Sequence, residues 1–213
     1  MDNIVAYRIA QSPEWTPSRC PPMQASGYEY ILAGNGIFVR AEDSRMKAMV
    51  LYRPAEVHGL SRLPQTARLK DSLIPCTWLH SIVASMRRHL PNECMYQIVR
   101  SGNDWRCVMP KQTVSATAVE FDDNPLSVVD IHSHNTMRPF WSTTDDADEQ
   151  GLRFYVVIGN LDQAMPTARA RAGVYGYHLD IPLDAIFDDY GLGWPVRDLF
   201  GEYGGNEDDE PIR

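Results

Sequence analysis

Ser127-Val128-Val129-Asp130-Ile131-His132-Ser133-His134 is an apolar stretch that ends in two histidines one residue apart. The stretch is typical of a buried β-strand, in which alternate side chains share a face, so we expect His132 and His134 to point the same way. Imidazole is the commonest protein ligand of zinc, and catalytic zinc sites usually have three protein ligands and one water. The stretch therefore predicts a buried strand with a metal site at its end.

A short loop leads from the histidines to Ser142-Thr143-Thr144-Asp145. Asp145 is the candidate third ligand, although on spacing alone Asp146 or Asp148 would serve as well. Ser-x-x-Asp before a helical stretch is also a capping-box-like pattern, with Ser142 as the N-cap and an acidic residue in the first turn. The two roles are compatible, because a helix that begins beside a metal holds its carboxylate rigidly.

Hydrolysis at a metal site also needs a carboxylate that takes a proton from the attacking water. Glu93 is the candidate, in the turn between an amphipathic helix and the next strand. Glu56, in the N-terminal part, and Glu120, inside a strand-like run, are the alternatives. If the site needed no base, Glu93 would be interpreted more simply as a solvent-exposed carboxylate in a turn.

The totals are those of a globular protein with a sizeable core: 213 residues, 44% of them hydrophobic and 23% charged. The net charge of −8 argues against a nucleic-acid-binding surface. No apolar run is long enough to span a membrane and no signal peptide opens the sequence, so we expect a cytoplasmic protein without a membrane partner. The four cysteines show no Cys-x-x-Cys spacing, and we expect them to be reduced and buried. Cys94 and Cys107 lie in apolar segments expected to form neighbouring strands, so a close pair is the alternative.

The chain divides into a β-rich region over residues 1–72, a main domain over residues 73–195 and an acidic, flexible tail over residues 196–213. After an irregular, proline-containing lead-in, Gly34-Asn35-Gly36 between two apolar runs predicts a β-hairpin. The spacing of apolar residues from Thr77 to Leu90 predicts one amphipathic helix. Further segments complete an α/β sandwich or α+β fold around one sheet: strands over 46–52, 94–99, 105–108, 114–121, 127–131, 154–159 and 169–179, and helices over 143–152 and 183–187.

The order Glu93, His132-Ser133-His134, seven residues and Ser142-Thr143-Thr144-Asp145 resembles the JAMM motif of the JAB/MPN metallopeptidases. The similarity extends from about Thr77 to Asp189 and includes a helix that ends in Pro-x-Glu. Asn135 is a departure, because many members have proline after the second histidine.

This resemblance implies a cytidine-deaminase-type sandwich, in which helices flank a central mixed sheet, with a small β-rich N-terminal extension. It implies that His132, His134 and Asp145 bind Zn²⁺, that Glu93 is the base and that Ser142 hydrogen-bonds the oxyanion. Phe140 and Trp141 would line the cleft or pack in the core. The implied reaction is cleavage of a peptide or isopeptide bond after the C-terminal tail of a ubiquitin-like protein.

A narrower resemblance is carried by the strand-rich N-terminal region and by Ile181-Pro182-Leu183-Asp184-Ala185-Ile186-Phe187. These features are similar to the protein A group of PRTRC systems, prokaryotic JAB-domain proteins encoded beside ubiquitin-like and E1-like (ThiF-like) proteins. The similarity implies that a ubiquitin-like protein or its conjugates, and an E1-like protein, are partners.

Two alternatives compete with this interpretation. Barrel-type metal hydrolases also carry Asp-x-His-x-His, but they need ~250 residues and further ligands from later strands. Only one histidine, His178, follows His134, which argues against a barrel. The other alternative is a non-catalytic or latent scaffold of the same fold, although scaffolding members typically lose the metal ligands that this sequence retains.

Overall fold

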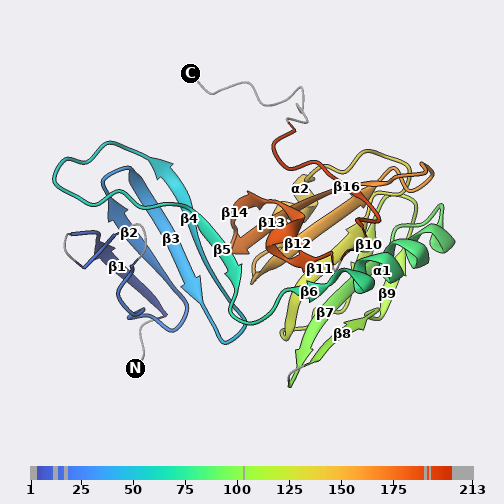
Figure 1. The fold of residues 1–213 in the computed structure, drawn as a ribbon, viewed down its shortest axis with the longest axis horizontal. Helices are drawn as coiled ribbons and strands as arrows, with labels where there is room; N and C mark the ends of the chain where they lie inside the picture. The colour runs from blue at the N-terminus through green and yellow to red at the C-terminus, as the bar shows by residue number, and fades with distance from the viewer. Residues whose placement is uncertain are drawn as a thin grey trace.

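The computed structural model describes residues 4–11, 14–16, 19–102, 104–189, 191 and 193–202. Two large sheets lie side by side, a five-stranded sheet from the N-terminal region and a seven-stranded sheet from the rest of the chain (Figure 1). The mixed α+β architecture agrees with the expected fold class.

The seven-stranded sheet has the order β14-β13-β12-β11-β7-β8, and a short strand β16 pairs with β13. Its central pair, β11 with β12, is parallel, whereas β11 with β7 and β12 with β13 are antiparallel, so the sheet is mixed. The strands are β7 (Met95–Ser101), β8 (Asp104–Val108), β11 (Ser127–Ser133), β12 (Leu152–Gly159), β13 (Thr167–Val174), β14 (Tyr177–Ile181) and β16 (Arg197–Asp198).

Helix α1 (Cys76–His89) packs on the apolar face of this sheet and begins and ends within one residue of the expected helix. Its buried Leu79, Ile82 and Met86 belong to the main core together with Ile131 of β11. Tyr96 of β7 also donates a hydrogen bond of 2.7 Å to the hydroxyl of Ser85. Because neighbouring strand residues alternate between faces, His132 points to the face opposite α1.

The five-stranded sheet has the order β1-β2-β3-β4-β5. The predicted hairpin is present as β2 and β3, paired through the turn after Ala33. The lead-in expected to be irregular contains a strand, β1, which pairs parallel to β2. The strands are β1 (Val5–Ile9), β2 (Tyr28–Ala33), β3 (Gly36–Glu42), β4 (Met46–Pro54) and β5 (Thr66–Leu69).

The two sheets share a core. One face of the N-terminal sheet has a small core of its own, which contains Trp15, Ile31 and Phe38. On the other face, β3 and β4 lie against β13 and β14, and Val39 and Val50 belong to the main core. Position 72 therefore separates the two regions in the chain but does not separate their packing.

Two segments expected to be single strands are hairpins. The 114–121 segment divides between β9 (Gln112–Val114) and β10 (Val119–Phe121), which pair antiparallel. The 169–179 segment divides between β13 and β14 at Tyr175 and Gly176, whose φ angles of 50° and 87° reverse the chain. Apolar alternation continues across both turns, which is why the sequence pattern did not reveal them.

The remaining elements are short. Helix α2 (Thr143–Asp148) ends before the expected residue 152 because Leu152 already belongs to β12. A 3₁₀ turn (Leu183–Ala185) occupies part of the expected 183–187 helix, and β6 (Ile74–Pro75) pairs with β15 (Phe187–Asp188).

The expected tail over residues 196–213 begins with packed residues. Val196 and Leu199 are buried, and β16 between them pairs with β13. Residues 203–213, which hold most of the expected acidic tail, lie outside the described residues.

All four cysteines are free, so Cys94 and Cys107 do not form the pair considered above. Cys76 and Cys94 are buried as expected, whereas Cys20 is exposed and Cys107 is half-buried. Among the described residues, no helix has the length and apolar character needed to cross a membrane.

Candidate metal centre

The two histidines stand at the end of β11, the strand on which the sequence placed them. His132 pairs in register with Val157 of β12, and the backbone N–H of His134 donates to Ile158 O at 2.8 Å. Both residues are only 5% exposed. Their Nε2 atoms lie 3.1 Å apart, so the two rings converge on one point as the strand alternation predicts.

Ser133, between the histidines, connects β11 to the chain beside Glu93. Its hydroxyl accepts a hydrogen bond of 3.0 Å from the backbone N–H of Cys94, and its own backbone N–H donates to Cys94 O at 3.1 Å. The start of β7 is thereby held against the strand that carries both histidines.

Asp145 reaches the histidines from the first turn of α2. Its Oδ1 lies 3.4 Å from Nε2 of His132, and its Oδ2 lies 3.9 Å from Nε2 of His134. The alternatives lie elsewhere: Asp146 pairs with Arg171 at 2.7 Å, and Asp148 is exposed.

Ser142 caps this helix with a complete capping box. Its hydroxyl accepts from the backbone N–H of Asp145 at 3.1 Å, and Asp145 Oδ2 accepts from the backbone N–H of Ser142 at 2.7 Å. The hydroxyl also donates to Asp145 Oδ2 at 2.7 Å. The expected capping pattern is therefore present, and it orients the carboxylate toward the histidines.

The ligand atoms of His132, His134 and Asp145 all lie within 4.8 Å of one another. Two ligand atoms that are each about 2.0–2.1 Å from a tetrahedral zinc lie about 3.3 Å apart. The separations of 3.1 Å between the histidine nitrogens and 3.4 Å from His132 to Asp145 match this value. Two imidazoles and one carboxylate thus fit a zinc ion in both donor chemistry and spacing.

The protonation states also suit a metal. Burial lowers the pKa of His132 to about 4 and also lowers the pKa of His134, which keeps both imidazoles neutral and able to coordinate. Burial acts to raise the pKa of Asp145, but the charge interaction with His132 and the hydrogen bonds from Ser142 outweigh it and lower the pKa. The cluster offers two neutral nitrogens and an ionised oxygen.

Glu93 is buried, only 5% exposed, immediately before β7. Its backbone N–H donates to Ser115 O at 2.8 Å, in the turn between β9 and β10. Burial, and then the negative charge of Asp145, raise the pKa of Glu93 to about 7, which places this carboxyl within electrostatic reach of the candidate metal ligands. The alternatives do not approach the cluster in this way: Glu56 is exposed and pairs with Arg62, and Glu120 is exposed on β10.

Asn135 explains the departure from the proline that many JAB/MPN members carry. Its φ of 50° is a conformation that proline, locked near −65°, cannot adopt. Its side chain donates a hydrogen bond of 2.9 Å to Ala116 O, so it joins the loop after His134 to the β9–β10 turn.

Aromatic residues before α2 pack against the site. Phe140 meets the ring of His134 edge-on, with centroids 4.5 Å apart, and Trp141 stacks on the guanidinium of Arg171. Phe140 is half-buried, so it both packs against His134 and borders the site. The Nδ1 atom of His134 is buried and has no hydrogen-bond partner among the described residues.

Arg171 and Glu149 were not among the predicted site residues. Arg171, on β13, donates from Nε to Oε2 of Glu149 at 2.6 Å, and both side chains are buried. Burial raises the pKa of Glu149 to about 8, against the opposing charge and hydrogen bond of Arg171. The sequence shows two arginines, Arg169 and Arg171, along this strand, and this pattern reveals neither which of them is buried nor its partner.

A mixed sheet, with a His-x-His strand facing the capped aspartate of a short helix, defines an α/β domain with a candidate metal site. Residues 75–172 match the model of a family described as prokaryotic homologs of the JAB domain. The match confirms the JAB/MPN resemblance, whereas the narrower similarity to PRTRC proteins stays a prediction. A comparison with curated proteins found no match.

Proposed function

We propose that the chain is a zinc-dependent peptidase or isopeptidase of the JAMM type. The observation that carries the proposal is a set of two neutral imidazoles and one ionised carboxylate within 4.8 Å, with the buried carboxyl of Glu93 in electrostatic reach. Structural zinc sites are closed by four protein ligands, whereas catalytic sites have three and keep a position open. The JAB family, whose prokaryotic model residues 75–172 match, includes metallopeptidases.

His132, His134 and Asp145 would hold the ion. When bound, zinc supplies a Lewis acid for the substrate carbonyl and lowers the pKa of a coordinated water. Glu93, buried beside the cluster, would take the proton from the attacking water and deliver it to the leaving amine. Ser142 hydrogen-bonds the developing oxyanion, for which its hydroxyl turns away from Asp145 Oδ2.

The proposed substrate is the C-terminal tail of a ubiquitin-like protein, either joined to an amine or awaiting maturation. The proposed partners are that protein and an E1-like protein of the same gene cassette. This part of the proposal is supported by the JAB family match and by the PRTRC-like features of the sequence. A cytoplasmic location fits the four free thiols, because reducing compartments keep cysteines unpaired.

A latent or scaffolding protein is the second candidate. It is favoured by the hydroxyl of Ser142, whose proton is already donated to Asp145 Oδ2. In a latent enzyme a partner would have to release this hydroxyl before turnover.

The first experiment is a measurement of zinc in the full chain purified without added metal, beside a His132→Ala/His134→Ala variant. About one zinc per chain in the parent and none in the variant supports the metal site. The parent is then assayed on fusions of ubiquitin-like proteins. If the parent binds zinc but hydrolyses none of the fusions, the latent or scaffolding protein is favoured. If the parent does not bind zinc even when zinc is added, the proposal is ruled out.

A further inference from the structure

Helix α2 carries Asp145, yet it lacks the features that usually hold a helix in place. It has six residues, none of them buried. A helix this short is not stable by itself in water, and most helices in proteins are held by an apolar face. Apolar packing of α2 itself therefore does not set the position of Asp145.

The capping box of Ser142 secures the beginning of α2 but does not attach it to the sheet. Both of its partners, Ser142 and Asp145, belong to the same four residues of chain. It fixes the local conformation and leaves open where the helix lies relative to His132 and His134.

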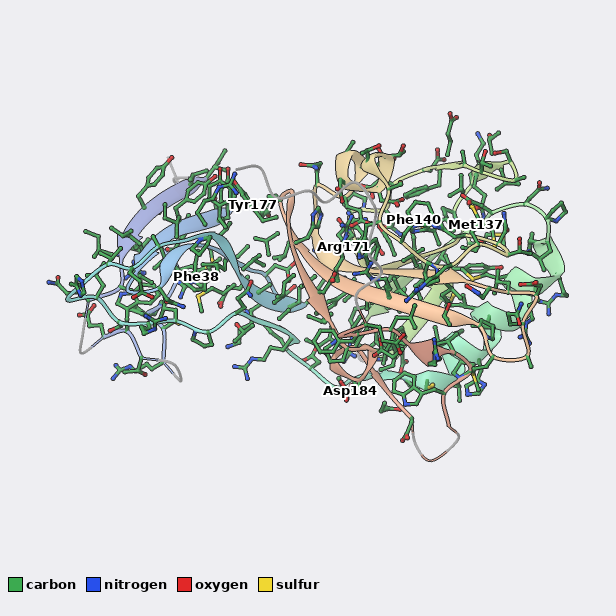
Figure 2. All side chains as sticks on the ribbon, turned by 90° about the horizontal axis from the view of Figure 1, so that it is seen from above. Phe38, Met137, Phe140, Arg171, Tyr177 and Asp184 are labelled. Carbon is green, nitrogen blue, oxygen red and sulfur yellow. The ribbon has the colours of Figure 1, made fainter. Side chains whose placement is uncertain are left out.

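Arg171 supplies the attachment. It is 4% exposed and extends from β13, and Figure 2 shows it in the lobe of the seven-stranded sheet, near Phe140. Its Nη1 lies 2.7 Å from Asp146 Oδ1, and its Nε lies 2.6 Å from Glu149 Oε2. Its Cζ lies 4.0 Å from the ring centre of Trp141.

These three contacts bracket α2. Trp141 precedes the N-cap, Asp146 is in the first turn, and Glu149 is the C-cap residue. One rigid guanidinium thus touches the chain before, within and after the helix that carries the carboxylate ligand. A lysine ammonium has no planar fork and cannot reproduce this set of contacts.

We propose that Arg171 is a positioning residue that sets the geometry of the metal-binding carboxylate by anchoring α2 to β13. The proposal rests on the proposed function, since it assumes that Asp145 is a metal ligand. Outer partners of this kind typically change metal affinity 10–100-fold when they are altered.

The matched control for Arg171 is Arg153. It is also a buried arginine on the same face of the sheet, one strand away on β12, and it pairs with Asp130 at 2.7 Å and Asp123 at 2.8 Å. Both of these partners lie outside α2. Arg171→Lys and Arg153→Lys therefore each replace a buried guanidinium that contacts two carboxyl groups. They differ in whether those carboxyl groups belong to α2 and its C-cap.

The test is a titration of the metal-free full chain with Co²⁺, which reports affinity and, through its visible absorption, coordination geometry. We expect Arg171→Lys to bind Co²⁺ about 10–100-fold more weakly than the parent, with an altered spectrum, and Arg153→Lys to match the parent. Amide hydrogen exchange of residues 143–149 in the metal-free protein should quicken in Arg171→Lys alone. Parental affinity, spectrum and exchange in Arg171→Lys would overturn the proposal, as would equal effects of both substitutions.

A second pair of variants covers the case in which Arg171→Lys does not fold. Asp146 and Asp148 are both exposed on α2, but only Asp146 pairs with Arg171. Asp146→Asn and Asp148→Asn remove the same charge, so a greater loss of Co²⁺ affinity in Asp146→Asn reports the contact with Arg171. Equal losses would count against it.

Failure of the proposal is distinguishable from failure of the proposed function. A parent that binds Co²⁺ but hydrolyses nothing contradicts the peptidase function, and the two pairs of variants still decide the role of Arg171. A parent that binds no metal contradicts both, because Arg171 would then have no ligand to position.

Discussion

The hydroxyl of Ser142 donates to the carboxylate of Asp145 at 2.7 Å, and in a capping box the backbone N–H of each residue donates to the side chain of the other. Asp145 Oδ2 thus receives two hydrogen bonds from one residue, and together with the charge interaction with His132 they hold its pKa below the usual range. The hydrogen bonds that cap the helix therefore also keep the candidate metal-binding carboxylate of Asp145 ionised.

Ser142→Ala tests whether Ser142 takes part in catalysis as well as capping α2 and hydrogen-bonding Asp145. Loss of the cap should cost about 0.5–2 kcal/mol of folding free energy, and metal affinity should fall because Asp145 loses a donor. If Ser142 also serves as an oxyanion donor, kcat should fall by about 10²–10³ when the variant is saturated with zinc. Ser142→Thr keeps the cap and hydroxyl and is the control; a zinc-saturated alanine variant with parental kcat would remove Ser142 from the chemistry.

Glu93→Gln should abolish hydrolysis while zinc stays bound, because glutamine fills the same space but cannot accept the proton of the water. Zinc per chain, together with turnover of a ubiquitin-like fusion, measures both effects. Equal turnover in this variant would show that another group is the base. Glu120→Gln, a change to an exposed carboxylate on β10, is the control and should leave both quantities unchanged.

The raised pKa of Glu93 also predicts a pH dependence of stability in the metal-free protein. A carboxyl whose pKa rises to about 7 on folding holds its proton more tightly in the folded state. Its contribution is fully present below the unfolded value near 4.5, and it is lost as the pH rises to about 7.

Urea unfolding of the parent and of Glu93→Gln across this range measures that contribution. The unfolding free energy of the parent minus that of Glu93→Gln should fall with rising pH by an amount on the order of 3 kcal/mol. A difference that does not change between pH 4.5 and pH 8 would mean that Glu93 is not buried near Asp145.

Asn135→Pro should be strongly destabilising, although proline is common at this place in the family. The backbone φ of 50° is closed to proline, and the hydrogen bond to Ala116 O would be lost. We expect a loss of about 3 kcal/mol or more, seen as a lower thermal midpoint, whereas Asn135→Gly should cost far less. Similar midpoints for the two variants would contradict the observed backbone conformation.

Val50→Asp should unfold both sheets together. Val50 is 1% exposed and belongs to the core that the N-terminal sheet shares with β13 and α1, and an unpaired charge there is costly. Fluorescence of Trp15, in the N-terminal core, and of Trp78, beside the main core, should report the same lowered transition. Transitions that separate, with only that of Trp15 shifted, would indicate independently stable units; Lys47→Asp is the control on the same strand.

Local sequence determined the parts of the site that depend on periodicity and spacing. Alternation along β11 is enough to place His132 and His134 on one face, and the cap pattern is enough to start α2 at Thr143. The apolar stripe of α1 and the glycines of the β2–β3 turn act over a few residues, so these elements were predictable to within about a residue or two.

Tertiary structure decided the features that join distant parts of the chain. The burial of Glu93 depends on the packing around β7. The contacts that hold α2 depend on Arg171, which lies 26 positions after Asp145. The shared core depends on the contact of β4 with β13. The two hairpins at residues 114–121 and 169–179 were hidden for a related reason, because apolar alternation carries no mark of where a strand reverses. Sequence patterns thus determined which residues share a strand or helix face, and only the packing of these faces against one another decided which side chains are buried together and what charge they carry.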